Sequence, residues 1–284
     1  MDRPVVSCHF IGQLGNQLFI AAATLAYAWD YGARAIFPGL HEERYRLSYH
    51  RDRLFFRLDA SASTKPFGKE YWQKYWFSAD RIPYCEEDLF LYGYFQSWKH
   101  FHHHRDKLLS IFAPHPQMLE DLYRRYRDLI KHPCTVAVHV RTNSKKTHPF
   151  TPFLGLNYLR DSMEQFPRDA KFVVFSDRIN WCKQHLPSLC KDCVFIEGNC
   201  PVEDLVLMSM MKHTIMANST FSWWGAYLNQ NPGQKIVVPS IVSVGAPTDS
   251  LYFPEWTVIP AAIHPYPSDM YSYDKLSQSM DNND

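Results

Sequence analysis

The sequence predicts an α/β protein made of two Rossmann-type halves. Three observations lead to this prediction: the chain length, a glycine-containing turn near the N-terminus, and a regular alternation of apolar runs and helical patterns in the second half. The 284 residues exceed the roughly 100–200 of one domain, so two domains are the more natural interpretation. Hydrophobic residues make up 46% and charged residues 21%, which excludes a disordered chain and provides for packed cores.

Charge and hydropathy exclude two classes of partner. The 30 Lys and Arg against 29 Asp and Glu give a net charge of +1, which argues against broad electrostatic binding to nucleic acid or an anionic membrane. A local basic pocket for phosphate stays possible. The longest apolar run, residues 18–29, is shorter than the roughly 20 residues of a membrane span, and no secretory signal is visible. We expect a cytoplasmic protein, with a removed Golgi anchor left open.

The N-terminal segment has the order strand, glycine turn, helix. Residues 5–11 are an apolar run, a turn follows at Gly12, Leu14 and Gly15, and residues 16–31 have a helical pattern. The segment lacks both the GxGxxG pattern of dinucleotide sites and the Lys-Ser/Thr of a P-loop. Two interpretations remain open. Gly12, Gly15 and Asn16 bring backbone and helix N-terminus close to a ligand, or they form a tight turn with a capping Asn.

Residues 32–131 show no sheet periodicity, so we expect short helices and loops there. The histidines at 100 and 102–104 suggest a metal patch, but no carboxylate or cysteine spacing supports one. Residues 106–132 have a basic amphipathic helical pattern, interrupted by prolines at 114 and 116 and ended by Pro133. We therefore expect the domains to be residues 1–132 and 133–284.

Four of the seven cysteines lie close together, at positions 182, 190, 193 and 200. A zinc site is one interpretation, but a single CxxC without a second pair is weak evidence for it. Ordinary thiols in a loop-rich region are the alternative.

The second half alternates strands with helices, which predicts a parallel sheet. The expected strands are residues 135–141, 171–177, 194–196 and 214–217, and the expected helices are residues 158–166 and 202–212. In such sheets ligands bind beyond the carboxyl ends of the strands. Polar side chains gather at those ends: His139, Arg141, Ser176, Asp177, Asn218, Ser219 and Thr220.

These residue types suit a nucleotide ligand. Arg141 provides a planar fork for phosphate oxygens, and Ser219 opens a helix whose N–H groups can do likewise. Asp177 can accept hydrogen bonds from a base or ribose. The alternative is a set of helix caps and strand-end polar residues with no ligand.

Several motifs together resemble the α-1,2-fucosyltransferases of glycosyltransferase family 11, over about residues 5–260 and in the same order. The specific Asn218-Ser-Thr-Phe-Ser-Trp-Trp-Gly-Ala-Tyr-Leu228 block is joined by five others: Gly12-Gln-Leu-Gly-Asn-Gln-Leu-Phe19, Gly93-Tyr-Phe-Gln-Ser97, His139-Val-Arg141, Phe175-Ser-Asp177 and Asp204-Leu-Val-Leu-Met-Ser209. The resemblance implies a GT-B fold, two Rossmann-like halves with a cleft between them. It also implies inverting transfer of L-fucose from GDP-fucose to the 2-hydroxyl of a terminal galactose, in acceptors such as lactose or N-acetyllactosamine.

The resemblance also implies roles for particular residues. Arg141 is expected on the β-phosphate and Asn16 facing the reacting fucose. The donor is expected mainly in the C-terminal half, where Ser219, Thr220 and Phe221 match the segment that cradles pyrophosphate and flanks guanine. On the acceptor side we expect Tyr94 and Gln96. No cofactor or metal is expected, so protein cations and N–H groups must stabilise the departing diphosphate.

The chain departs from the family after Arg141. The usual Arg-Gly-Asp is replaced by Thr142, Asn143 and Ser144, followed by two lysines at 145 and 146 that either bind phosphate or form a solvated loop. This departure keeps two alternatives open: a non-catalytic nucleotide-sugar or glycan-binding relative, and a GT-B fucosyltransferase with another acceptor. His139 is a candidate general base by residue type, although a buried core histidine is the more common situation. For Trp223 and Trp224, packing is favoured over stacking on a ligand.

Overall fold

The computed structural model describes residues 3–142, 152–190, 192–244 and 247–263. The chain forms two compact units. The first contains Met1–Asp121 and Pro247–Pro254, and the second contains Leu122–Ala246 and Glu255–Asp284. The chain passes from one to the other within helix α4 (Pro116–Lys131), and the expected boundary after residue 132 lies just beyond the end of this helix.

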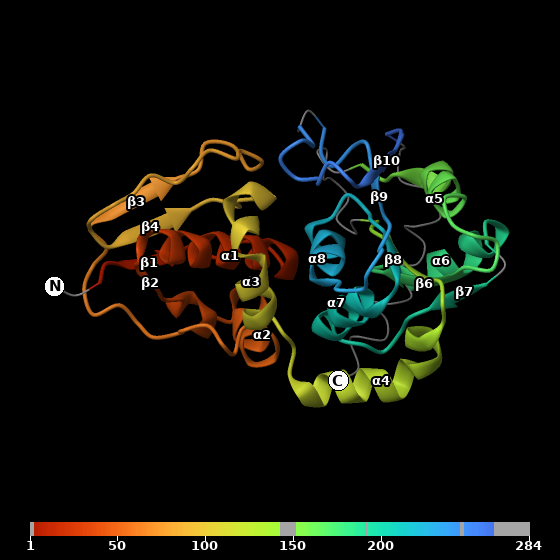
Figure 1. Cartoon of the computed structure of the whole chain (residues 1–284), viewed down its shortest axis with the longest axis horizontal. Coiled ribbons are helices and arrows are strands. Elements are labelled where there is room, and N and C mark those ends of the chain that lie inside the picture. Colours follow the sequence, from red (N-terminus) through yellow and green to blue (C-terminus); the bar gives the residue numbers. More distant parts are fainter. Residues whose placement is uncertain (1–2, 143–151, 191, 245–246, 264–284) are drawn as a thin grey trace, which may run out of the picture. The chain divides into compact units, whose positions relative to one another are not determined.

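The first unit is built on a four-stranded parallel sheet in the order β2-β1-β4-β3 (Figure 1). Its strands are β1 (Val5–Cys8), β2 (Arg34–Ala35), β3 (Lys69–Trp72) and β4 (Leu89–Tyr92). Its helices are α1 (Leu14–Tyr31), η1 (Pro38–His41), η2 (Arg44–Arg46), α2 (Leu47–Arg53), η3 (Trp98–His100), η4 (His102–His104) and α3 (Arg105–Ile111). Helix α1 is apolar nearly all round and is buried along most of its length, which is what such a pattern requires.

Three expectations for this unit were wrong. Strands β2, β3 and β4 lie in the region where we expected only short helices and loops, because strands of two to four residues are too short to show periodicity. Strand β1 ends at Cys8, before Ile11. Helix α1 begins at Leu14, so Gly15 lies within its first turn and not in the preceding loop.

The second unit has a six-stranded sheet, also fully parallel, in the order β10-β9-β8-β5-β6-β7. Its strands are β5 (Thr135–Val140), β6 (Lys171–Ser176), β7 (Cys193–Phe195), β8 (His213–Ile215), β9 (Ile236–Pro239) and β10 (Thr257–Ile259). Its helices besides α4 are α5 (Gly155–Met163), α6 (Ile179–His185), η5 (Leu186–Ser188), α7 (Pro201–Met210) and α8 (Thr220–Leu228). The alternation predicted from residue 135 onward is confirmed, although α5 begins earlier than expected and α6, β9 and β10 were not foreseen.

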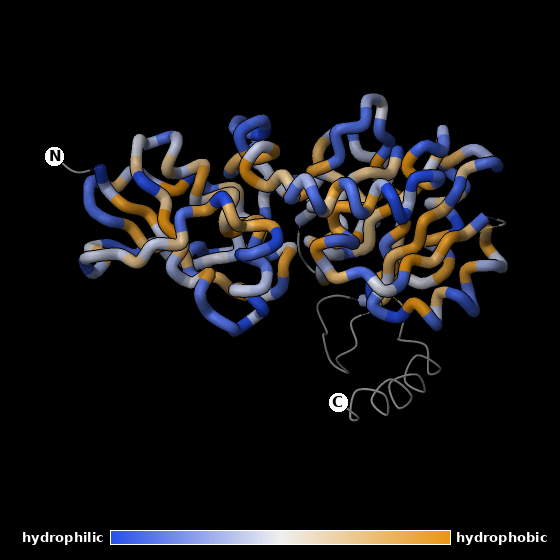
Figure 2. Tube along the Cα trace, turned by 90° about the horizontal axis from the view of Figure 1, so that it is seen from below, coloured by the Kyte–Doolittle hydropathy of each residue, from blue (hydrophilic) through white to orange (hydrophobic). Residues whose placement is uncertain are grey.

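The core of the second unit contains the two tryptophans of the Asn218 block. Trp223 and Trp224 are both fully buried, which confirms their packing role. Helices α7 and α8 pack closely because Gly225 has no side chain: a Cβ there would lie 2.4 Å from the sulfur of Met208. Figure 2 shows hydrophobic segments running through the interior of each unit, with hydrophilic segments in the outer turns.

The interrupted helix expected over residues 106–132 is two helices, α3 and α4, separated at the prolines. Cys190 and Cys193 form a disulfide and Cys182 is a buried free thiol. The bonded pair has no thiolate to offer, so the four-cysteine zinc site is not formed. No helix in the described part of the chain combines the length and apolar character needed to cross a membrane.

Candidate active site

Arg141 and Asp177 meet at the carboxyl end of the second sheet. Strands β5 and β6 pair in register, with Val140 opposite Ser176, so the residues that follow each strand are neighbours. The Arg141 Nη1 atom lies 3.1 Å from Asp177 Oδ2. The Arg141 side chain keeps 37% of its surface exposed, so the carboxylate orients a guanidinium that solvent or a ligand still reaches.

Thr142 occupies the other oxygen of this carboxylate. Its backbone N–H and its Oγ1 each donate to Asp177 Oδ1 at 3.0 Å. Thr142 is almost fully buried, so it holds Asp177 from within the protein. The first residue of the departure from the family pattern is therefore part of the site. Asn143, Ser144, Lys145 and Lys146 lie outside the described residues.

Both oxygens of the Asp177 carboxylate have partners within the protein. We expected its carboxylate to accept from a base or ribose, which stays a prediction, and in the structure its oxygens contact Arg141 and Thr142. Its visible task is to orient Arg141. The only sign of this orienting role in the sequence is that both residues lie at strand ends.

His139 is a buried neutral imidazole. It is 6% exposed, its ring lies 5.5 Å from that of Phe221, and Nδ1 has no hydrogen-bond partner among the described residues. Burial, with Arg141 as the second cause, lowers the pKa of His139 to about 3. A group with this pKa is a poor general base near neutral pH.

The Asn218 block begins beside the same strand end. Ser219 is the N-cap of α8, and its Oγ accepts from the N–H of Phe221 at 3.3 Å. Thr220 is the first helical residue, where the helix dipole favours an anion. Asn218 is buried, and its Nδ2 donates to the carbonyl of Pro152 at 2.7 Å. Asn218 thus anchors the chain before the helix.

In the first unit, the loop between β1 and α1 positions Asn16. Gly12 has φ +77°, and a Cβ at this position would lie 2.3 Å from Asn16 Nδ2. Asn16 Oδ1 accepts from Gln96 Nε2 at 2.9 Å. The structure therefore brings together three predicted residues, Gly12, Asn16 and Gln96, although the last is 80 positions from Asn16 in the sequence.

Gln17 and His50 support this loop, and no pattern in the sequence pointed to His50. Gln17 Nε2 donates to the carbonyls of Gly12 at 2.9 Å and Tyr45 at 3.0 Å. His50 Nδ1 donates to Gln17 Oε1 at 2.7 Å, because the amide nitrogen is already engaged as a donor. Burial lowers the pKa of His50 to about 4, so the imidazole stays neutral.

Tyr94 lies two residues before Gln96, which is hydrogen-bonded to Asn16. Its half-buried ring contacts Trp76 edge-on, with centroids 5.2 Å apart, and burial raises its pKa. The backbone N–H of Gln96 donates to the carbonyl of Trp76 at 3.0 Å. Tyr94 and Gln96 therefore share a neighbour, Trp76, that the sequence analysis did not assign to the site.

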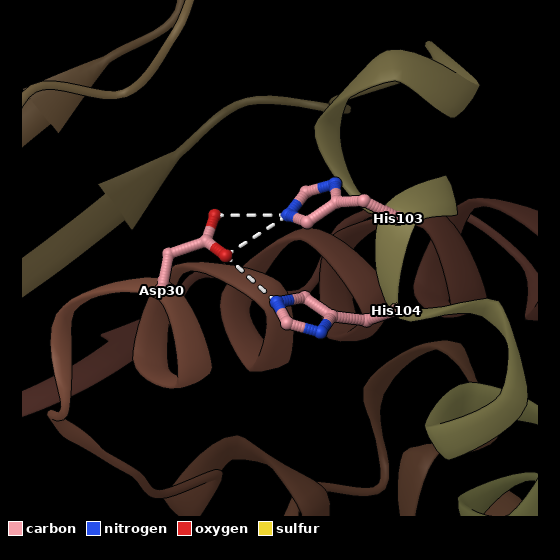
Figure 3. Close-up of side chains that lie close together, drawn as sticks. All are labelled: Asp30, His103 and His104. Carbon is pink, nitrogen blue, oxygen red and sulfur yellow. Dashed lines mark hydrogen bonds and ion pairs between the residues drawn. The ribbon is translucent and has the colours of Figure 1, made fainter.

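The histidine patch does acquire a carboxylate. His103 and His104 both direct Nε2 toward Asp30 near the end of α1, at 2.9 Å and 2.7 Å from Oδ1 (Figure 3). Two imidazoles and one carboxylate are a ligand set for zinc. Asp30 is 73 positions from His103 in the chain, so spacing in the sequence could not show this carboxylate.

The cluster of Asp30, His103 and His104 lies far from Asn16 along helix α1. Asp30 is fourteen residues beyond Asn16 on the same helix, which corresponds to roughly 21 Å at the rise of an α-helix. A metal held there cannot touch a ligand group that contacts Asn16.

Comparison with known proteins identifies the family. Residues 6–260 match the profile described as Glycosyl transferase family 11. The chain belongs to glycosyltransferase family 11. This confirms the resemblance drawn from the Asn218 block and the other motifs.

Two kinds of relative are similar to the chain. A galactoside α-(1,2)-fucosyltransferase 2 from Gorilla gorilla gorilla is 29% identical over 288 residues, which cover 93% of this chain and 81% of the relative. An α-1,2-colitosyltransferase from Escherichia coli is 37% identical over 147 residues, which cover 48% of this chain and only 50% of the relative.

The fold is that of the GT-B fucosyltransferases. The fucosyltransferase NodZ from Bradyrhizobium superposes with a TM-score of 0.58 at 12% identity, covering 82% of this chain and 97% of NodZ. A NodZ α-1,6-fucosyltransferase crystal soaked with GDP-fucose gives a TM-score of 0.55 at 11% identity, covering 80% and 93%. At these identities the likeness shows the fold alone, and it confirms the predicted α/β class.

Proposed function

We propose that the protein is an inverting galactoside α-1,2-fucosyltransferase that uses GDP-fucose and needs no metal. The observation that carries the proposal is the partly exposed Arg141, held by Asp177 at the end of β5, in a chain that matches the family from residue 6 to 260. The relatives that cover most of the chain are named as galactoside α-(1,2)-fucosyltransferases.

Arg141 stabilises the departing diphosphate. In the proposed reaction the galactose O2 attacks C1 of fucose, the bond from C1 to the β-phosphate oxygen breaks, and GDP leaves with the electron pair. The hydroxyl proton passes to solvent or to a phosphate oxygen. Negative charge grows on the β-phosphate, and Arg141 and the N-terminus of α8 stabilise it.

Asp177 and Thr142 act through Arg141 as positioning residues. A guanidinium fixed before the donor binds loses less side-chain entropy on binding than a free one. Because both oxygens of Asp177 are engaged, the carboxylate is held in one orientation. Thr142, the first residue of the altered segment, thus has a positioning role in the proposed site.

Asn16 is proposed to face the reacting sugar. Its Oδ1 is occupied by Gln96, so the amide is fixed in one direction. An amide orients the attacking hydroxyl without removing its proton early, which suffices if the bond to the leaving group is largely broken first. His139, with its pKa near 3, is not needed as a base.

A second donor is favoured by the match to a colitosyltransferase. Colitose differs from L-fucose by lacking the 3-hydroxyl, so the same phosphate contacts serve both donors. A site that hydrogen-bonds the 3-hydroxyl would reject GDP-colitose strongly, because a buried polar group would lose its partner.

The test is product formation. GDP-fucose and GDP-colitose are each incubated with lactose and N-acetyllactosamine, with and without EDTA, and products are analysed by mass and linkage. We expect an α-1,2-fucosylated galactoside at the same rate in EDTA. GDP-fucose binding without transfer would instead support a non-catalytic relative, and transfer only from GDP-colitose would change the donor.

A further inference from the structure

Three aromatic side chains lie in a row at the carboxyl edge of the first sheet. Trp72 is the last residue of β3, Tyr92 is the last of β4, and His9 directly follows β1. The rings of Trp72 and Tyr92 stack at 4.0 Å with an interplanar angle of 5°, and those of Tyr92 and His9 lie 5.7 Å apart. We call these three residues the aromatic row.

The row follows from the topology of the sheet. Strands β1, β4 and β3 are adjacent and parallel, and Trp72 pairs directly with Tyr92 in the register. With strands about 4.8 Å apart, three neighbouring strand ends extend over about 10 Å. That distance is longer than one sugar ring.

Trp72 is more exposed than packing would require. Its side chain is 64% exposed even though one indole face is covered by Tyr92. The indole N–H donates to Glu70 Oε2 at 3.0 Å, which fixes the ring orientation. An exposed aromatic ring that is held in one orientation is suited to stacking on a ligand.

The chemistry of this surface fits a sugar. The electron-rich face of an indole attracts the polarised C–H groups on the apolar side of a pyranose ring, while the hydroxyl groups of the sugar point sideways to polar partners. His9 supplies such a partner, because a neutral imidazole both donates and accepts; burial and Arg44 lower its pKa.

The row begins at the proposed acceptor site. The loop that carries Gly12 and Asn16 follows β1 just after His9, and the segment that carries Tyr94 and Gln96 follows β4 just after Tyr92. Asn16 and Gln96 are hydrogen-bonded to each other. From this pair, the strand order leads outward along β4 to β3, where Trp72 lies at the edge of the sheet.

We propose that the aromatic row of His9, Tyr92 and Trp72 binds the sugars that precede the terminal galactose of the acceptor. This rests on the proposed fucosyltransferase function and adds the substrate class. The preferred acceptor is then an oligosaccharide of three or more sugars, with Trp72 stacking on a sugar beyond the disaccharide.

The experiment compares acceptors of different length. Values of kcat and KM are measured for methyl β-galactoside, lactose and lacto-N-neotetraose in the wild type, Trp72→Ala and Trp72→Phe. The matched control is Tyr84→Ala, which removes an aromatic side chain that is 56% exposed and that contacts Tyr31 at the far end of α1.

We expect Trp72→Ala to raise KM for the tetrasaccharide about tenfold, with kcat and the values for methyl β-galactoside unchanged. Trp72→Phe keeps an aromatic ring at this position, so its KM for the tetrasaccharide should stay close to that of the wild type. The kcat and KM values of Tyr84→Ala should match those of the wild type. The proposal is overturned if Trp72→Ala changes KM for the tetrasaccharide and KM for methyl β-galactoside by the same factor, or changes neither value.

A direct binding measurement separates this proposal from the proposed function. Saturation-transfer NMR detects contact between the protein and the tetrasaccharide without any donor or turnover. If the wild type transfers fucose to no acceptor, the proposed function fails. Tetrasaccharide signals that vanish in Trp72→Ala then still support the row, whereas equal signals in the two proteins overturn it.

Discussion

At the residue scale, Arg141 is defined by its neighbours. Its guanidinium pairs with Asp177, which Thr142 holds at the other oxygen, so one carboxylate connects a family motif to a residue outside the family pattern. Position at a strand end predicted Arg141 and Asp177. It could not predict that the two side chains pair with each other, because each of them could equally well contact a ligand at a strand end.

Replacing Arg141 with Ala should lower kcat by about 10²–10³-fold, because the departing phosphate loses its main cation. The fold should be unaffected, since the side chain is partly exposed. Initial rates with GDP-fucose and lactose test this, and circular dichroism checks folding. The control is Arg160→Ala, which removes an exposed arginine of α5 paired with Asp161. A folded Arg141→Ala variant with native turnover would remove Arg141 from the mechanism.

Asp177→Asn should weaken donor binding about tenfold, because the uncharged amide holds Arg141 less firmly. Thr142→Val should have a smaller effect, since it removes the Oγ1 hydrogen bond and leaves the backbone one. Calorimetric titration with GDP measures both. Equal GDP affinity in Asp177→Asn and the wild type would make the carboxylate merely structural.

At the element scale, the loop between β1 and α1 combines backbone conformation with side-chain contact. Gly12 has a positive φ and lies against Asn16, while Gln17 binds the carbonyl of Gly12 and is held in turn by His50. The glycine turn was predicted from local sequence. The contact between Gln17 and His50 was not, because it joins residues that are 33 positions apart in the chain.

Gly12→Ala should reduce both stability and activity. The substitution adds backbone strain of about 1–2 kcal/mol and forces Asn16 to move. Gly32→Ala is the matched control, since Gly32 also has a positive φ of 68° but has open space around it. Chemical denaturation should show a lower free energy of unfolding in both variants, while initial rates should fall only in Gly12→Ala. Equal rates in the two variants would argue against a role for the Asn16 position.

His50 makes the first unit sensitive to acid. Its folded pKa of about 4 lies below the ordinary value of 6.5, so between these pH values the unfolded chain binds a proton that the folded chain does not. The stabilisation is complete above pH 6.5 and falls by up to about 3 kcal/mol as the pH approaches 4.

Urea denaturation at several pH values measures this loss. His50→Asn retains an amide donor for Gln17 but does not titrate, so its free energy of unfolding should depend less steeply on pH between 6.5 and 4. Identical pH dependence in the two proteins would show that His50 is not responsible.

At the scale of the whole molecule, chelation should leave catalysis intact. Among the described residues, the group that could hold a metal is Asp30, His103 and His104, and it lies roughly 21 Å along α1 from Asn16. We expect the same initial rate before and after treatment with EDTA. A loss of rate that Mn²⁺ or Mg²⁺ restores would contradict the metal-free reaction.

The sequence by itself determined the α/β class, the parallel second sheet and the family. These depend on local patterns: alternating buried strands and helices, and contiguous motifs such as the Asn218 block. It also placed Arg141, Asp177 and Ser219 at one edge, because parallel strands bring their carboxyl ends together.

Only the tertiary structure decided the contacts between distant segments. Asn16 meets Gln96, Asp30 meets two histidines, and Trp72 stacks on Tyr92 because strands and helices far apart in the chain pack side by side. Side-chain direction, burial and hydrogen-bond partner all depend on that packing. Periodicity and spacing record which residues share a face, whereas the choice of partner is made when the sheet and its helices assemble.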